Sequence, residues 1–151
     1  MKHFIKLLSV SAFLFIYLLS GSLTSQAQVS LNFSNAPTLE SGTALTQGAK
    51  YRFSNVAPGT DALVTLTTIT ANTQLITIDN NASSTARFQP TIYTTAPGAA
   101  VGYVRFDFQL VATGTTIPRA VPGVLISAQD IDGTSGTNRE FIEFVGLTNT
   151  S

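Results

Sequence analysis

Four carboxylates are concentrated near the end of the sequence, within residues 124–145. They are half of the eight acidic residues in a 151-residue chain of which only 11% is charged. Two of them stand at positions i and i+2 just before a glycine, and two follow in the next apolar run. Such oxygen ligands suit calcium, which binds about six to eight oxygens. The predicted metal ligands are Asp130, Asp132, Glu140 and Glu143.

The same carboxylates are open to two other interpretations. A strand–turn–strand hairpin with an Asp-Gly turn and solvated acids needs no metal. Two carboxylates that flank a sugar bond would make a glycosidase, but the sequence has no Trp to stack on a sugar ring. The sequence therefore leaves the cofactor as none or Ca²⁺, and it favours a protein that is not an enzyme.

Composition excludes several other kinds of site. The chain has no Cys, and its single His is His3, close to the N-terminus. A Ser–His or Cys–His nucleophile pair, a zinc site and a disulfide therefore cannot form in the chain that remains after this N-terminal segment is removed. Neither of the two glycine-rich phosphate-binding motifs occurs. Eight basic residues balance eight acidic ones, so charge gives no reason to expect a nucleic-acid partner.

Residues 1–27 have the features of a signal peptide. Lys2 and Lys6 precede an apolar run over residues 7–19, and Ser25 and Ala27 supply the small residues that a signal peptidase requires. The apolar run is shorter than the roughly 20 residues that span a bilayer. We therefore expect a protein secreted or displayed on the cell surface, with no stable membrane insertion after cleavage. Residues 28–151 are expected to form a single domain, or the N-terminal part of a longer protein.

The remaining sequence predicts short strands separated by Gly, Pro and Asn turns, and no long helix. In the second strand we expect Tyr51, Phe53 and Asn55 on one side and Arg52, Ser54 and Val56 on the other. In the third, Val64 and Leu66 should face away from Thr65 and Thr67. A proline makes the fifth an edge or bent strand. The predicted strands are residues 29–33, 50–56, 62–71, 74–79, 86–94 and 101–112.

The last of these strands has the clearest alternation of apolar and polar residues in the chain. Val104, Phe106, Phe108 and Leu110 alternate with Tyr103, Arg105, Asp107 and Gln109. This pattern predicts the central strand of an antiparallel sheet, with its apolar side chains buried. Together the strands predict an all-β fold, an antiparallel β-sandwich of the jelly-roll or immunoglobulin-like type.

Four phrases of the sequence, at residues 51–66, 88–90, 102–108 and 130–144, form a recognisable set. Together they resemble a β domain of large secreted surface and adhesin-like proteins of gliding Gram-negative bacteria, many of which use type IX secretion. The resemblance implies a non-enzymatic module outside the cell, structural or adhesive. The alternative is a carbohydrate-binding or carbohydrate-active extracellular protein that uses the acidic loop and exposed aromatics such as Tyr51, Tyr93 and Tyr103. The partner would be an extracellular glycan or protein.

Overall fold

The computed structural model describes residues 28–80, 86–95, 101–124, 126 and 143. These residues form six strands, and no helix is found among them. None of the described segments could therefore cross a membrane as a helix. The expected signal peptide and nearly all of the predicted acidic hairpin lie outside the described residues. The strands are β1 (Thr38–Ser41), β2 (Lys50–Ala57), β3 (Thr60–Ile69), β4 (Thr73–Thr77), β5 (Thr91–Thr94) and β6 (Val104–Ala112).

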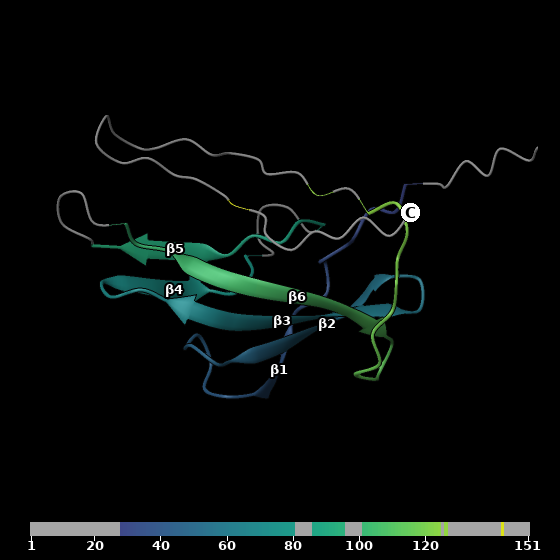
Figure 1. Ribbon diagram of the computed structural model, residues 1–151, viewed down its shortest axis with the longest axis horizontal. Coiled ribbons are helices and arrows are strands. Elements are labelled where there is room, and N and C mark those ends of the chain that lie inside the picture. The colour runs from purple at the N-terminus through teal and green to yellow at the C-terminus, as the bar shows by residue number, and fades with distance from the viewer. Residues whose placement is uncertain (1–27, 81–85, 96–100, 125, 127–142, 144–151) are drawn as a thin grey trace, which may run out of the picture.

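The strands form two antiparallel sheets. One has four strands in the order β1-β2-β3-β6, and the other pairs β4 with β5. In Figure 1, β4 and β5 lie side by side at the left, while the four-stranded sheet extends to the right. The all-β, antiparallel prediction is thus confirmed for the described chain, and five of the six predicted strands are present with shifted ends.

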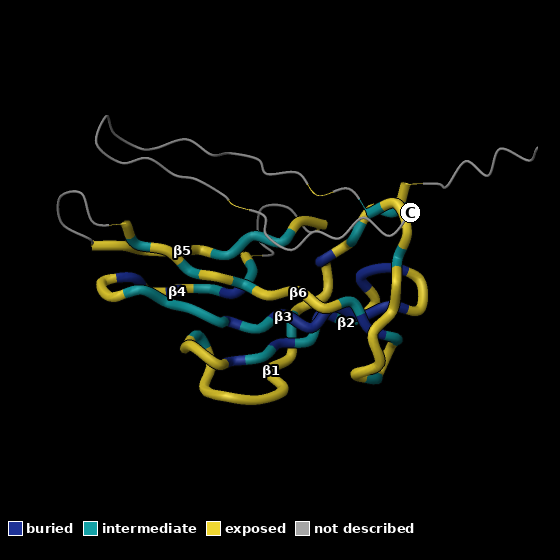
Figure 2. Tube along the Cα trace, viewed as in Figure 1, coloured by how far each residue is buried: buried dark blue, intermediate teal, exposed yellow. Residues whose placement is uncertain are grey.

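The side chains of both sheets meet in one apolar cluster. Strands β2 and β3 contribute its centre, where Phe53, Val64 and Leu66 are completely buried, and β4 adds Leu75. The predicted facing of Val64 and Leu66 away from Thr65 and Thr67 is confirmed. Figure 2 shows the consequence, with buried segments concentrated in β2 and β3 and exposed ones along β5 and much of β6.

Phenylalanine rings extend this cluster from the centre of the sheet to its β6 side. Phe88 contacts Phe33 and Phe53, at centroid distances of 5.7 and 5.8 Å, and Phe106 and Phe108, at 5.3 and 5.0 Å. Nearly all of these contacts are edge-to-face, the arrangement that aromatic rings favour. Phe88 therefore links residues outside the four-stranded sheet to its strands β2 and β6.

A bulge in β2 corrects the predicted facing of that strand. The pairing with β3 shifts between Phe53 and Ala57, and Asn55 adopts a left-handed backbone with φ of 55°. Between these two pairs β2 has three residues and β3 has one, so β2 carries two extra residues. This bulge turns Val56 into the core, where it is 1% exposed, whereas Asn55 is exposed. The strict alternation that placed Asn55 with Phe53, and Val56 opposite, was therefore wrong beyond Ser54.

The first predicted strand is also corrected. Residues 29–33 form only an isolated bridge, from Val29 to Val124, although Phe33 is buried as a core residue. Hydrogen bonds from Asn32 N to Val56 O (2.8 Å) and from Phe33 N to Ala86 O (3.2 Å) hold this stretch without a continuous ladder. In contrast, β1 occurs where the sequence predicted only a polar connection.

Strand β6 lies at the edge of the four-stranded sheet and not at its centre as predicted. Its alternation is in the expected register, because Phe106 and Leu110 pack against the core while Arg105 and Gln109 are exposed. Phe108, however, is 49% exposed, so the prediction that it is buried was wrong. The alternation identified the apolar side of the strand but could not show how fully the opposite layer covers it.

Candidate binding groove

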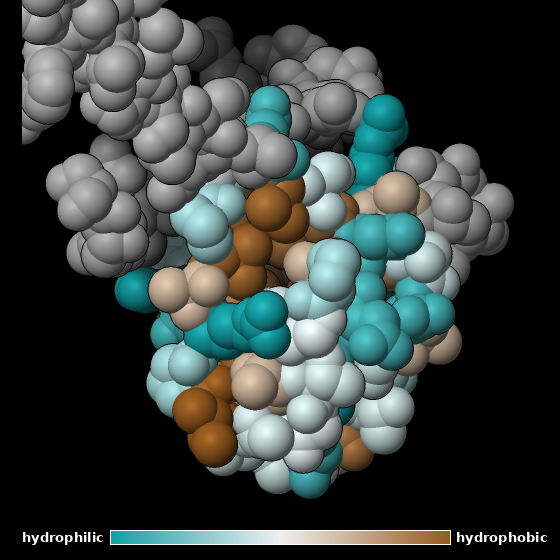
Figure 3. Space-filling view, turned by 90° about the vertical axis from the view of Figure 1, so that its right-hand side faces the viewer, coloured by the Kyte–Doolittle hydropathy of each residue, from teal (hydrophilic) through white to brown (hydrophobic). Residues whose placement is uncertain are grey.

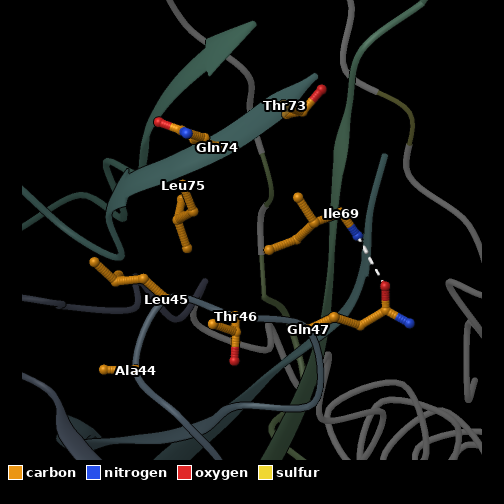
Figure 4. Close-up of a pocket in the computed structure, with 8 residues that line it drawn as sticks. All are labelled: Ala44, Leu45, Thr46, Gln47, Ile69, Thr73, Gln74 and Leu75. Atoms are coloured by element: carbon orange, nitrogen blue, oxygen red, sulfur yellow. Dashed lines mark hydrogen bonds between the residues drawn. The ribbon is translucent and has the colours of Figure 1, made fainter. Parts of the chain in front are cut away.

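A hollow in the described chain forms a groove between the β1–β2 loop and the start of β4. Its volume is about 460 Å³. Figure 4 shows Ile69 and Leu75 pointing toward each other across the groove, with Leu45 beneath them. The residues that line it are Ala44, Leu45, Thr46, Gln47, Ile69, Thr73, Gln74 and Leu75.

Backbone hydrogen bonds fix the loop that forms the lower wall. Gly48 N donates to Leu66 O (2.7 Å) and Leu66 N donates to Ala49 O (2.9 Å), so the loop end is tied to β3. Leu45 has a left-handed backbone, with φ of 60°, and its N–H donates to the Tyr51 hydroxyl (2.8 Å). This buried hydroxyl therefore holds Leu45 at the floor of the groove.

The opposite wall is the tight connection from β3 to β4. Asn72 adopts a left-handed backbone with φ of 61°, which asparagine tolerates better than most residues. The hydroxyls of Thr70 and Thr73 lie 2.9 Å apart and share a hydrogen bond. Thr73 is thereby buried at the rim, whereas its neighbour Gln74 is exposed.

The chemistry of this groove is neutral. An aliphatic floor is bordered by two hydroxyl and two amide side chains, and none of the lining residues is titratable. Gln47 directs its Oε1 at Ile69 N, 3.4 Å away. The groove therefore offers apolar contact and neutral hydrogen bonds, but its lining contains no group that could serve as a general acid or base.

Two of the three tyrosines expected to contact a ligand are exposed. Tyr93 is 58% exposed and pairs across the β4–β5 ladder with Gln74, a residue at the rim of the groove, although Tyr93 does not itself line it. Tyr103 is 44% exposed. Tyr51 is only 5% exposed and accepts the hydrogen bond from Leu45, so the expectation that its ring could stack on a ligand was wrong.

A buried carboxylate lies on the other side of the four-stranded sheet. Asp61 is 1% exposed and accepts hydrogen bonds from Arg52 Nη1, Asn55 N and Gly114 N, each at 2.9 Å. Burial acts to raise the pKa of Asp61, but the two backbone N–H groups and the guanidinium outweigh it and leave the pKa below its usual value. Arg52 also pairs with Glu40. This network ties β1, β2, β3 and the turn after β6 together, which is a structural role.

A second carboxylate, Asp79, has the opposite behaviour. Burial raises its pKa above the usual value, although Gln89 N donates to its Oδ1 at 2.7 Å. Sequence reasoning singled out neither Asp61 nor Asp79. Both carboxylates accept hydrogen bonds from residues at least six positions away along the chain, so sequence spacing gave no signal for them.

The predicted metal ligands are almost entirely outside the described residues. Asp130, Asp132 and Glu140 belong to that part of the chain, and Glu143 is described and exposed. Within the described residues no group of three or more His, Cys, Asp or Glu side chains is placed to hold a metal ion. The calcium site thus stays a prediction from the sequence.

A second, smaller hollow lies at the opposite end of the molecule. Its volume is about 240 Å³, and it is formed by the β2–β3 turn and residues 119–122. Arg119 crosses it to donate from Nη1 to Gly59 O at 2.8 Å. Figure 3, which views this end, shows hydrophobic areas interrupted by hydrophilic residues. Because Arg119 occupies this hollow and stabilises the β2–β3 turn, we assign the hollow a structural role.

Comparison with known proteins identifies no relative, because no family model matches the sequence and neither a curated protein nor a solved structure is significantly similar to it.

Proposed function

We propose that this chain is a non-enzymatic, structural or adhesive module that acts outside the cell. The observation that carries the proposal is the neutral groove on an all-strand scaffold: its lining can hold a ligand but has no titratable group. The signal-peptide pattern of residues 1–27 supports export, and the resemblance to surface and adhesin-like β domains supports display or secretion. The partner is an extracellular glycan or protein.

The scaffold of this module is proposed to be an antiparallel β-sandwich. Leu75 and Ile78 reach the same apolar cluster as Phe53 and Val64, so the two sheets share one core. Packing of two sheets around a common core is the arrangement of sandwich folds.

Substitution at the groove tests the binding role. The full-length exported protein would be screened on arrays of extracellular glycans and surface proteins, and the best ligand titrated. Gln74→Trp, at the groove, should weaken binding at least about tenfold. Ile76→Trp is the matched control, since Ile76 is exposed on the same face of β4 but does not line the groove. Equal binding by both variants, or turnover of a substrate by the wild type, would count against the proposal.

Export is tested separately. Mass spectrometry of protein recovered outside the cytoplasm should find Gln28 as the first residue, because cleavage is expected after Ala27. Recovery of chains that retain Met1 would contradict export by a cleaved signal peptide without bearing on the groove.

Carbohydrate binding is the alternative that one observation favours. Tyr93 is the most exposed tyrosine of the described chain and lies across from Gln74 at the groove. An aromatic face beside neutral hydrogen-bonding groups is suited to a sugar ring. Under this alternative Tyr93→Ala abolishes binding to the glycan array, while Ile117→Ala, a change at another exposed hydrophobic residue, leaves it unchanged.

A further inference from the structure

The outer edge of β6 is open over most of its length. All nine residues of β6 pair with β3 along the inner edge. On the outer edge, Ala112 N donates to Ile117 O and Arg119 N donates to Leu110 O, both at 2.9 Å, which occupies only the far end. In the described part of the chain, no strand pairs with this edge between Val104 and Gln109.

These end contacts fix the direction of every backbone group in the strand. Alternate residues of a strand point their N–H and C=O groups to the same side. Leu110 accepts with its C=O and Ala112 donates with its N–H on the outer edge. The N–H and C=O groups of Val104, Phe106 and Phe108 therefore also point to the outer edge. The register is continuous on β6, since the bulge in this pair lies on β3 between Leu66 and Thr68. The backbone N–H and C=O groups of these three alternate residues can therefore form hydrogen bonds with another strand.

The side chains along this edge carry a self-complementary charge pattern. Arg105 and Asp107 share one face, 3.3 Å apart, and their side chains are 55% and 53% exposed. On the other face Phe108 is 49% exposed. Charged residues on an edge strand usually discourage association. One charge of each sign at positions i and i+2 instead favours pairing with an antiparallel copy of the same strand.

We propose that two copies of this chain associate through the open edges of their β6 strands, antiparallel about a two-fold axis at Phe106. In this arrangement Val104 of one copy lies opposite Phe108 of the other, and the two Phe106 residues lie opposite each other. All of these residues direct their backbone groups outward, so each pair forms hydrogen bonds. Arg105 then lies opposite Asp107 of the second copy, twice, at non-hydrogen-bonded positions where side chains approach most closely.

The charges also exclude the neighbouring registers. An axis at Arg105 would place two arginines opposite each other, and an axis at Asp107 would place two aspartates opposite each other. Like charges directly across a ladder are destabilising. A longer ladder is prevented at Leu110 by Arg119. The self-complementary interface is of the isologous kind common in homodimers, it covers the exposed Phe108 ring, and it does not depend on what the groove binds.

A charge-swap experiment on the full-length exported protein tests this interface. Sedimentation equilibrium should show a concentration-dependent dimer for the wild type. Arg105→Asp and Asp107→Arg should each dimerise at least about tenfold more weakly, because each places like charges across the ladder. An equimolar mixture of the two variants should form a heterodimer, and the double variant R105D/D107R should dimerise like the wild type. Circular dichroism would confirm that each variant is folded.

Hydrogen exchange tests the register and the competing occupants. The amides of Val104, Phe106 and Phe108 should exchange more slowly as wild-type concentration rises, and should stay fast in Asp107→Arg. A wild type that remains monomeric overturns the proposal. If those three amides are then protected at every concentration, another segment of the same chain covers the edge. Unimpaired single variants, or a mixture that fails to associate, would overturn it as well.

Discussion

Asp61 is a carboxylate held almost entirely away from water, and its cost of burial is offset by three hydrogen bonds. Breaking a buried ion pair by removing one partner usually destabilises a protein strongly. Asp61→Asn should lower the free energy of unfolding by about 3 kcal/mol. This is the lower end of the usual range, because Arg52 keeps its ion pair with Glu40. Urea denaturation at neutral pH measures this.

The matched control is Asp107→Asn at low protein concentration. The Arg105–Asp107 pair is more than half exposed, so its loss should cost less than about 1 kcal/mol. Equal losses for the two variants would show that Asp61 is not the centre of the network.

The same residue predicts a pH dependence. The pKa of Asp61 is lower in the folded protein than its usual value, so its stabilising contribution is complete above about pH 3.9. That contribution is lost as the pH falls through the folded-state pKa. The stability difference between wild type and Asp61→Asn should therefore be constant at neutral pH and shrink below about pH 4. A difference that does not change with pH in acid would contradict this origin.

At the scale of single strands, the bulge in β2 is the point at which the sequence pattern failed. Tyr51 and Phe53 were correctly predicted to share one side of the strand, because an unbroken strand alternates. The bulge adds two residues to β2, and asparagine at a left-handed position gives only a weak sequence signal for it. Strand β1 was not predicted because its residues are all exposed and have no apolar alternation.

The left-handed backbone at Asn55 makes a direct prediction about the bulge. Asn55→Gly should be neutral or slightly stabilising, because glycine adopts positive φ without strain. Asn55→Val should cost about 1–2 kcal/mol, because β-branched side chains resist this conformation. Ser54→Val, one residue earlier in the same strand, is the control and should have little effect. The melting temperatures of the three variants test this prediction. If Asn55→Val melts at the same temperature as the wild type, the bulge is absent.

The acidic hairpin predicted over residues 124–145 belongs to the same scale. Four carboxylates accompanied only by Arg139 repel one another unless a cation binds, protons bind or they are spread apart. A calcium site with a Kd of about 10⁻⁴–10⁻³ M would stabilise the protein by about 1–2 kcal/mol at ~5 mM calcium. Melting curves in calcium and in EDTA measure this.

The double variant D130N/D132N is the control for the calcium experiment, and its melting temperature should not respond to calcium. Identical melting temperatures of the wild type in both buffers would leave a solvated hairpin. If the double variant then melts higher than the wild type in EDTA, repulsion among the carboxylates is present without a metal.

At the scale of the whole molecule, the sequence predicted the class of the fold better than its arrangement. The apolar side of β6 was identified from alternation, but its place at the sheet edge depends on which strands it pairs with. The groove was not predicted at all, because Leu45, Ile69 and Leu75 come from segments that only the tertiary fold brings together. Local sequence patterns predict which side of a strand is apolar. The order of strands in a sheet and the position of a groove depend on contacts between residues far apart in the sequence.

The shared core predicts that the two sheets unfold together. A two-stranded ribbon such as β4–β5 is marginal at best by itself, so its stability must come from Leu75 and its neighbours packed against β2 and β3. Hydrogen exchange of the wild type should therefore give the amides that bond across the β4–β5 ladder the same free energy of opening as those across β2–β3.

Leu75→Ala tests this coupling, because it removes a side chain that is 4% exposed and should cost about 2–5 kcal/mol. If the core is one unit, the variant lowers the protection of both ladders equally. Ile76→Ala, the exposed neighbour on β4, should lower neither. Earlier exchange of β4–β5 in the wild type, or a Leu75→Ala effect confined to that ribbon, would show that the two sheets are separate units and would remove the basis for a sandwich.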